Sequence, residues 1–370
     1  MLKVILFANT DWFLYNFRLQ TAKGLRDAGY DVLLVSPDGA YVPRLKAAGF
    51  AWREFPISRR GMNPVVELWT ILRFYWLLRQ EKPDFLNNYT IKCVIYGSFA
   101  AQWAKIPHVV NTITGLGYVF SNPAKGGFLR WLVKQLYRLA LRRTNTIFIN
   151  QDDKALFLRN KMVPQDHCVI IESCGVDIVK FSPAKESTDI PLVLFAGRLL
   201  IDKGIQEFVE AARIIKDKEL AARFVLVGQL DRGNPASISE DQLVQWQQQD
   251  LVEYWGWQDD MVNIYHQAHI VCLPAYREGV PKSLLQAAAC EKPLVATDVP
   301  GCRAVVNDGE NGFLVPSHDS EKLADALTRL IEDKALRQKM GKAGRSIVSQ
   351  RFSDEQVVEQ TLAFYQSLMS

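Results

Sequence analysis

The residues best suited to chemistry lie in the stretch at 275–298. Glu278 stands beside Gly279 in a predicted loop, and glycine permits a backbone path that other residues avoid. Pro281 suits the first turn of a helix, because the amide hydrogen it lacks would be unpaired there anyway. A helix N-terminus attracts anions through its N–H groups and its dipole, and Lys282 adds a full positive charge. The stretch therefore predicts an anion site, with an ordinary loop, helix and strand of an α/β domain as the alternative.

A second pair of cations, Arg198 and Lys203, follows a predicted strand and the turn at Gly197. Strand ends meet the ligand-binding edge of an α/β sheet. There, Arg offers a planar fork of donors and Lys a point charge, which together suit a diphosphate. The spacing alone favours ordinary surface cations, so the diphosphate interpretation depends on the motif that both stretches form together.

Together the two stretches resemble the donor-site signature of retaining glycosyltransferases of family 4, which have the GT-B fold. The matching elements are Gly197-Arg198 with Lys203-Gly204, and Glu278-Gly279 followed by Gln286-Ala287 and 293–298. The resemblance implies that Glu278 contacts the transferred sugar and that Arg198 and Lys203 hold the diphosphate; these three are the predicted catalytic residues. The predicted donor-binding set is Gly197, Gly228, Gly279, Val280, Pro281, Lys282, Ser283 and Gln286.

This chain departs from the family at one donor position. Members of the family have a second Glu, eight residues after the first, that contacts the ribose hydroxyls, and Gln286 stands there instead. Gln can still hydrogen-bond a hydroxyl, but it carries no charge. The departure bears on donor affinity more than on the class of reaction.

The expected chemistry is departure of a nucleoside diphosphate from a sugar. Negative charge grows on the leaving group, and Arg198, Lys203, Lys282 and helix-end amides can stabilise that charge. The chain has no clear Asp-x-Asp pair, since its acidic pairs at 152–153 and 259–260 are adjacent. We therefore expect metal-independent catalysis, with no cofactor besides the UDP-sugar substrate. Retention of configuration, with the departing diphosphate as base, is implied by the resemblance.

The acceptor is expected to bind the first half of the chain. Asn9, Asp11, Asn16 and Arg18 occupy the first predicted strand–helix turn, where many relatives carry a glycine pair. Helix capping by Asn16 and Arg18 is the open alternative. Thr114-Gly115, within 111–120, replaces a His-Gly that touches the donor sugar or acceptor in many relatives. The predicted acceptor-binding residues are Asn9, Asp11, Asn16, Arg18, Thr114 and Gly115.

Two stretches predict a membrane partner. Residues 125–143 contain six cations and no acid, interleaved with large apolar residues, and residues 65–79 are a second candidate rich in Trp, Leu and Phe. Basic amphipathic helices of this kind can lie in the interface of an anionic membrane. Ordinary packing of the apolar side on the sheet is the alternative.

The order of predicted elements indicates the fold that positions these residues. Strands alternate with helices from residue 2 to 150, and the cycle restarts near residue 191, which is typical of parallel doubly wound sheets. We expect an α/β GT-B protein with two Rossmann-like domains facing a central cleft. The predicted divisions are an acceptor-binding and membrane-facing domain at 1–180, a nucleotide-sugar domain at 181–352, and a helix at 353–370 that crosses back to the first domain.

Composition limits the location and the partners. No stretch is long and apolar enough for a membrane span, and residues 1–9 predict a strand rather than a signal peptide. The six scattered Cys lack metal spacing and are expected to be reduced core thiols. Residues 1–183 carry 24 Lys and Arg against 13 Asp and Glu, whereas the remainder carries 20 against 27. A basic first half suggests an anionic partner.

The function predicted from these features is a peripheral enzyme on the cytoplasmic face of the inner membrane. The segments at residues 14–18, 114–118 and 276–282 resemble enzymes that add N-acetylgalactosamine to undecaprenyl-diphosphate-linked sugars. These enzymes include the diacetylbacillosaminyl-diphospho-undecaprenol N-acetylgalactosaminyltransferases. The predicted partners are a UDP-sugar, a lipid-diphosphate-linked saccharide and an anionic membrane, in surface-glycan or glycoprotein-glycan assembly, with no nucleic acid. The alternatives are a soluble transferase with a small-molecule or glucan acceptor, a non-catalytic member, and a nucleic-acid-binding module. The sequence names neither the sugar nor the linkage.

Overall fold

The chain divides into two units, which are described separately. The computed structural model describes residues 1–58, 61, 63–115, 127–187 and 189–369. Unit 1 comprises Met1–Gly175 and Asp354–Ser370, and unit 2 comprises Val176–Ser353. The chain passes between the units at 175/176 and 353/354, close to the divisions at 180/181 and 352/353 expected from the sequence.

Unit 1 is built on a seven-stranded sheet whose described pairings are all parallel, in the order β3-β2-β1-β4-β5-β6-β7. Its strands are β1 (Lys3–Phe7), β2 (Asp31–Ser36), β3 (Ala51–Glu54), β4 (Phe85–Tyr89), β5 (His108–Ile113), β6 (Asn145–Phe148) and β7 (Cys168–Ile170). Val4 pairs with Val32 on one side and with Phe85 on the other. β1 and β2 contain continuous apolar runs, at 4–7 and 32–35, as expected where helices cover both faces of a sheet.

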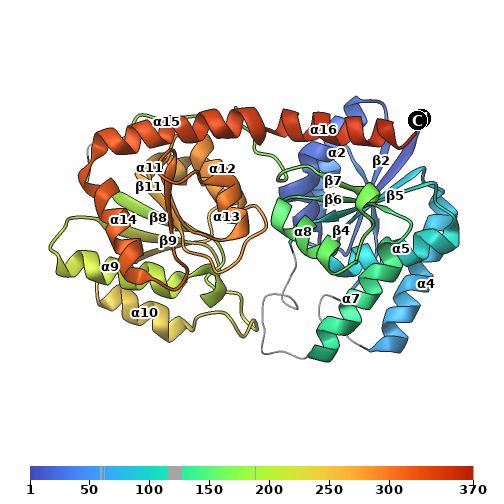
Figure 1. Ribbon diagram of the computed structural model, residues 1–370, viewed down its shortest axis with the longest axis horizontal. Coiled ribbons are helices and arrows are strands. Elements are labelled where there is room, and N and C mark those ends of the chain that lie inside the picture. The colour runs from blue at the N-terminus through green and yellow to red at the C-terminus, as the bar shows by residue number, and fades with distance from the viewer. Residues whose placement is uncertain (59–60, 62, 116–126, 188, 370) are drawn as a thin grey trace. The chain divides into compact units, whose positions relative to one another are not determined.

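The helices of unit 1 form two layers around this sheet (Figure 1). They are α1 (Asp11–Phe13), η1 (Leu14–Arg18), α2 (Leu19–Asp27), α3 (Val42–Ala47), α4 (Pro64–Glu81), α5 (Ile91–Ala104), α7 (Gly127–Leu141), α8 (Gln151–Arg159), η2 (Gln165–His167) and α16 (Asp354–Ser367). α16 packs against α2, while α5 packs between α4 and α7. The C-terminal helix therefore completes the core of unit 1.

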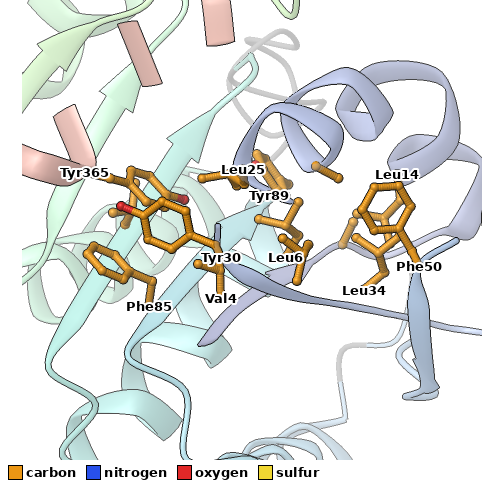
Figure 2. Close-up of a cluster of buried hydrophobic side chains, with 14 of the residues drawn as sticks. Val4, Leu6, Leu14, Leu25, Tyr30, Leu34, Phe50, Phe85, Tyr89 and Tyr365 are labelled. Atoms are coloured by element: carbon orange, nitrogen blue, oxygen red, sulfur yellow. The ribbon is translucent and has the colours of Figure 1, made fainter. Parts of the chain in front are cut away.

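The core beneath α2 and α16 joins residues far apart in the sequence (Figure 2). Tyr365 of α16 stacks on Phe85 of β4, with 4.8 Å between ring centroids, and meets Tyr30 edge-on. Asn87 donates a hydrogen bond to the Tyr365 hydroxyl over 2.9 Å. Both ends of the chain thus contribute side chains to one buried cluster.

The first helix starts earlier than its apolar spacing predicts. The sequence places its beginning at Arg18, whereas helical structure begins at Asp11 and passes through the π-helical turn η1 before α2. Thr10 caps the start by accepting a hydrogen bond from the Phe13 amide over 3.1 Å. The π turn changes the direction of the side chains that follow, which hides this helix from a search at a period of 3.6 residues.

Unit 2 is built on a six-stranded sheet, with all described pairings parallel, in the order β10-β9-β8-β11-β12-β13. Its strands are β8 (Leu192–Ala196), β9 (Arg223–Val227), β10 (Glu253–Gly256), β11 (Ile270–Leu273), β12 (Leu294–Thr297) and β13 (Gly312–Val315). Its helices are η3 (Ile201–Lys203), α9 (Ile205–Asp217), α10 (Glu240–Gln248), α11 (Met261–Gln267), α12 (Lys282–Ala289), α13 (Pro300–Val305), α14 (Ser320–Glu332) and α15 (Lys334–Arg351). The two doubly wound parallel sheets predicted from the sequence are confirmed.

Each sheet has one point at which the strand order reverses. In unit 1 this point lies between β1 and β4, and in unit 2 it lies between β8 and β11. Ligands of open α/β sheets bind outside the carboxyl ends of the strands at such a switch point. The segments after β1 and β4, and after β8 and β11, are therefore where each unit is expected to hold a ligand.

Candidate active site

In unit 2 the structure brings two predicted catalytic residues together. Lys203 ends η3, in the connection after β8, and Glu278 lies in the loop after β11, 75 residues further along the chain. The Lys203 ammonium donates a hydrogen bond to Glu278 Oε1, and the two side chains are 20% and 14% exposed. A carboxylate and a cation thus meet at the switch point, with a small fraction of each surface open to a ligand.

The loop that carries Glu278 is held against the start of α9 by several contacts. Gly204 has a φ of +72°, and a Cβ there would lie 2.0 Å from the carbonyl oxygen of Pro274. The Tyr276 amide donates to the Asp202 carbonyl over 3.0 Å. The Tyr276 hydroxyl donates to Glu207 Oε1 over 2.8 Å. These contacts fix the backbone two residues before Glu278.

A third side chain completes the support of this loop. His318, with a φ of +63°, stacks on Tyr276 with 3.8 Å between ring centroids. Its Nδ1 lies 3.4 Å from Glu207 Oε1. Burial, and then the hydrogen bond to Glu207, raises the pKa of Tyr276, so its hydroxyl stays protonated and able to donate. Glu207 and His318 do not belong to the motif and were missed from the sequence.

The predicted diphosphate cation Arg198 has a different environment. Its guanidinium donates to Asp231 over 2.9 Å, and its side chain is 52% exposed. The backbone before it is fixed by Gly228, whose φ is +145° and whose added Cβ would lie 1.8 Å from the Gly197 carbonyl oxygen. The turn after β8 and the turn after β9 touch backbone to backbone, which only glycine allows. Arg198 is therefore a cation on a fixed turn, open to solvent and paired with one carboxylate.

The remaining donor-set residues lie around the start of α12. Val280 and Pro281 are buried, Pro281 is the N-cap, and Lys282 and Ser283 open the helix. Small residues let this helix lie close to the sheet and to α15. An added Cβ on Gly301 of α13 would lie 2.1 Å from the Gly279 carbonyl oxygen, so α13 also presses on this turn.

Gln286 projects from α12 toward a buried tyrosine. The Tyr265 hydroxyl donates to Gln286 Oε1 over 3.2 Å, and Tyr265 is fully buried. The oxygen accepts this bond with one of its two lone pairs, and the amide nitrogen can donate to a ligand. A ribose hydroxyl oxygen can accept from it.

In unit 1 the predicted acceptor residues fall into different environments. Asn9 follows β1 at the switch point. Asp11 is 7% exposed, and its Oδ2 accepts a 2.7 Å hydrogen bond from the Tyr41 amide. That carboxylate therefore anchors the loop after β2. Asn16 donates to the Trp12 carbonyl over 3.0 Å from within the π turn.

Arg18, the one cation of the predicted acceptor set, is 5% exposed and lies over the ring of Tyr89 at 4.6 Å. It stands at the N-cap position of α2 without a side-chain capping hydrogen bond, and Thr10 caps the helical segment that begins at Asp11. Thr114 and Gly115 follow β5, with Gly115 at a φ of +136°. Residues 116–120 of that predicted motif lie outside the described residues.

The helices α4, α5 and α7 expose large apolar side chains. On α7 the residues Val133, Tyr137, Ala140 and Leu141 are buried against the unit, as the packing alternative predicts. The exposed apolar residues of the three helices are Val65, Val66, Leu68, Trp69, Trp76, Trp103, Phe128, Trp131, Leu132 and Leu139. We call these ten residues the aromatic surface. Residues 125 and 126 lie outside the described residues.

The described residues were compared with the requirements of a metal site and of a membrane-spanning helix. No group of three or more His, Cys, Asp or Glu side chains is placed to hold a metal ion among the residues that the structure describes. Over the same residues, no helix combines the length and the apolar character needed to cross a membrane. All six Cys are unpaired, and burial raises the pKa of the Cys93 thiol to about 12.

Comparison with known proteins defines the class. Residues 178–347 match the family described as Glycosyl transferases group 1, and residues 3–151 match Glycosyl transferase 4-like. The chain is 30% identical over 343 residues to the N,N'-diacetylbacillosaminyl-diphospho-undecaprenol alpha-1,3-N-acetylgalactosaminyltransferase of Campylobacter jejuni, and the match covers 89% of each chain. It is 26% identical over 295 residues to the UDP-Gal:alpha-D-GlcNAc-diphosphoundecaprenol alpha-1,3-galactosyltransferase of Escherichia coli, covering 76% of this chain and 75% of that one.

The fold agrees with a solved structure. The crystal structure of Anabaena HepE in complex with UDP and glucose is similar to this chain, with a TM-score of 0.81 and 20% sequence identity, covering 99% of this chain and 100% of that one. The two parallel sheets and their neighbours define a GT-B glycosyltransferase fold. The chain belongs to the group 1 and 4-like glycosyltransferase family, so it is a glycosyltransferase.

Proposed function

We propose that this glycosyltransferase moves N-acetylgalactosamine from its UDP-sugar to an undecaprenyl-diphosphate-linked saccharide, with retention and without a metal ion. The observation that carries the donor assignment is the Lys203–Glu278 pair at the β8/β11 switch point. The names of the relatives from Campylobacter and Escherichia specify diphosphoundecaprenol-linked acceptors, which supports a lipid-diphosphate-linked saccharide as the acceptor.

The proposed reaction uses the residues of unit 2 in distinct roles. The acceptor hydroxyl forms a bond to the anomeric carbon as the bond from that carbon to the UDP oxygen breaks. The hydroxyl proton passes to the departing diphosphate, and attack from the face that the diphosphate leaves retains the configuration. Lys203 and Arg198 stabilise the growing negative charge on the diphosphate. Electrostatic stabilisation of this kind is the largest single contribution to the rate acceleration of many enzymes. Glu278 orients the sugar through its hydroxyls.

The Lys203–Glu278 pair predicts a change of partner when the donor binds. In the structure, Lys203 donates to Glu278. A diphosphate offers Lys203 a stronger acceptor than a single carboxylate oxygen, since it carries more charge and more oxygens. Lys203 then turns to the diphosphate and leaves Glu278 Oε1 to accept from the sugar. The pair thereby holds Glu278 in place before the donor arrives.

The aromatic surface supports a peripheral membrane location. Trp and Phe favour the headgroup region of a bilayer, and the cations at 130, 142 and 143 on and after α7 favour anionic lipid. On α7, Lys134 and Arg138 are bonded to Asn160, so they contribute charge from fixed positions. Contact with the membrane would bring the enzyme to a lipid-linked acceptor.

The test is UDP release from a panel of UDP-sugars, with an undecaprenyl-diphosphate-linked sugar present or absent, and with EDTA added. We expect acceptor-dependent release with UDP-N-acetylgalactosamine that survives EDTA. Glu278→Ala should abolish it, and Glu210→Ala, which removes an exposed acid of α9, should not. Release only with another donor would correct the sugar, and loss of release in EDTA would refute the metal-independent mechanism. Acceptor-independent release at the full rate would refute the lipid acceptor.

A further inference from the structure

Arg18 is a buried cation that has cation–π contacts but no anionic partner among the residues that the structure describes. It is 5% exposed, and its Nε is fully buried with no hydrogen-bond partner among the described residues. Its guanidinium carbon lies 4.6 Å from the centre of the Tyr89 ring and 5.7 Å from that of Phe13. Ring faces replace only part of the hydration that a guanidinium loses on burial. Such a group is costly to keep unless an anion reaches it.

The space beside Arg18 is small, and its walls are partly polar and partly apolar. A cavity of about 10 Å³ is bordered by Arg18, Thr21, Asn87, Tyr89, Thr112 and Ser173, together with apolar residues and Thr361 of α16. That volume accommodates one group the size of a water molecule. No carboxylate lines it, so an oxygen that entered would find donors and a positive charge.

The placement of this cavity connects it with the ligand-binding edge. Tyr89 ends β4, Thr112 is next to last in β5, and Ser173 follows β7, so the lining reaches the carboxyl ends of the strands. Arg18 itself ends the π turn η1, and single π turns are frequent at functional sites. The turn directs a long side chain inward where a regular helix would place it elsewhere.

We propose that Arg18 is the anchor of a phosphate-binding site in unit 1 that takes one phosphoryl oxygen of the acceptor's diphosphate. The guanidinium donates through Nε and a terminal nitrogen, the fork geometry that phosphate oxygens match. The remainder of the diphosphate lies outside the cavity, at the carboxyl ends of β4 and β5. This inference rests on the proposed lipid-diphosphate acceptor, and it assigns to Arg18 the group that is recognised.

Two other roles of Arg18 make different predictions. A structural role through the Tyr89 ring alone would make the residue matter for folding and not for anion binding. A cavity occupied by a permanent water would satisfy Nε and leave the site closed to phosphate. Both are distinguished by measuring the binding of a diphosphate that requires no turnover.

The experiment titrates inorganic pyrophosphate, and separately an undecaprenyl-diphosphate-linked N-acetylglucosamine in detergent, into the full chain by calorimetry. UDP is kept saturating, so that the donor site in unit 2 is filled. Arg18→Gln removes the charge and Arg18→Lys keeps the charge without the fork. Arg26→Gln is the matched control, since Arg26 lies on α2, is 42% exposed in its side chain and also lies over an aromatic ring.

We expect Arg18→Gln to weaken both ligands about 10- to 100-fold, the effect of losing hydrogen bonds to a charged group, with a smaller effect for Arg18→Lys. Arg26→Gln should match the wild type. Weakening of the lipid alone supports the site with the lipid as its source. Unchanged lipid binding in Arg18→Gln overturns the assignment, as does weakening of pyrophosphate alone.

Two further outcomes distinguish a failure of the phosphate site from a folding defect and from a failure of the proposed function. If Arg18→Gln does not fold, the Arg18→Lys titration and the wild-type thermal midpoint decide, because a site of this kind requires the undecaprenyl-diphosphate-linked N-acetylglucosamine to raise that midpoint in saturating UDP. No rise overturns the proposal. If no UDP-sugar turns over while binding of this lipid depends on Arg18, the phosphate site stands and the proposed function fails.

Discussion

Breaking the Lys203–Glu278 pair should affect stability and activity in a coupled way. The side chains are 20% and 14% exposed, so removing one partner leaves the other mostly buried and unpaired. Loss of one partner of a fully buried pair costs about 3–5 kcal/mol. Allowing for the exposure that remains, we expect Lys203→Met and Glu278→Gln each to lower the free energy of unfolding by about 1–3 kcal/mol.

The double variant is the informative protein. If the pair interacts as the structure shows, the stability lost in Lys203→Met with Glu278→Gln should be smaller than the sum of the single losses by at least about 1 kcal/mol. Urea unfolding of the four proteins without UDP measures this coupling. Arg223→Met is the control, because the Arg223–Glu253 pair of the same unit is 44% and 42% exposed and should contribute at most about 1 kcal/mol.

Activity tests the same pair through the leaving group. Lys203→Met should lower kcat about 10²- to 10³-fold, since one preorganised donor to a developing charge typically contributes that much. UDP-release kinetics at saturating donor and acceptor give kcat directly. Additive stability losses, within about 0.5 kcal/mol, would refute the energetic pairing. A wild-type kcat in Lys203→Met would refute its role at the diphosphate.

Three further predictions concern other parts of the molecule. Gly228→Ala should abolish UDP binding measured by calorimetry, because the added Cβ would lie 1.8 Å from the Gly197 carbonyl oxygen in the turn after β8. Gly256→Ala, also at positive φ but with nothing within 4 Å of the added Cβ, should keep UDP binding. Equal UDP affinities of the two variants would contradict this reasoning. Burial lowers the pKa of His269, whose Nδ1 accepts from the first amide of β8 over 3.1 Å, so the unfolded chain binds more protons below about pH 6.5. The free energy of unfolding should therefore fall as the pH decreases from about 6.5 through the folded-state pKa of His269. The urea midpoint of His269→Gln should fall less steeply with decreasing pH than that of the wild type. An equal pH dependence of the two midpoints would exclude His269 as the cause. Trp131→Ser should weaken sedimentation with anionic vesicles about tenfold while Trp257→Ser, in unit 2, should not, and equal effects would remove the aromatic surface from membrane binding.

The support of the donor loop required the structure. Tyr276 lies two residues before Glu278 and opens the 276–282 segment of the resemblance, but the sequence did not indicate which side chains it contacts. Its partners Glu207 and His318 are 69 and 42 positions away in the sequence. The positive φ of His318, at a position between a strand and a helix, is not readable from a histidine. Only the folded loop shows that the three side chains meet.

The sequence by itself determined the class of fold and predicted which charged residues lie at the ends of the strands. Apolar runs of strand length alternating with helical spacing specify parallel sheets, and Gly, Arg, Lys and Glu at fixed offsets specify cations and a carboxylate at strand ends. Local patterns of this kind depend on neighbours within a few residues. They are therefore legible without coordinates.

Tertiary structure alone decided which charges meet and which side chains are buried. Lys203 pairs with Glu278 across 75 positions, Asp11 anchors the loop at Tyr41, and Arg18 is buried with no anionic partner in the described part of the chain. Pairing depends on strand order, and burial depends on α16, whose 14 residues come from the far end of the chain. Long-range contacts carry no local signature, because the same Arg on an exposed helix face would have the same neighbours in sequence.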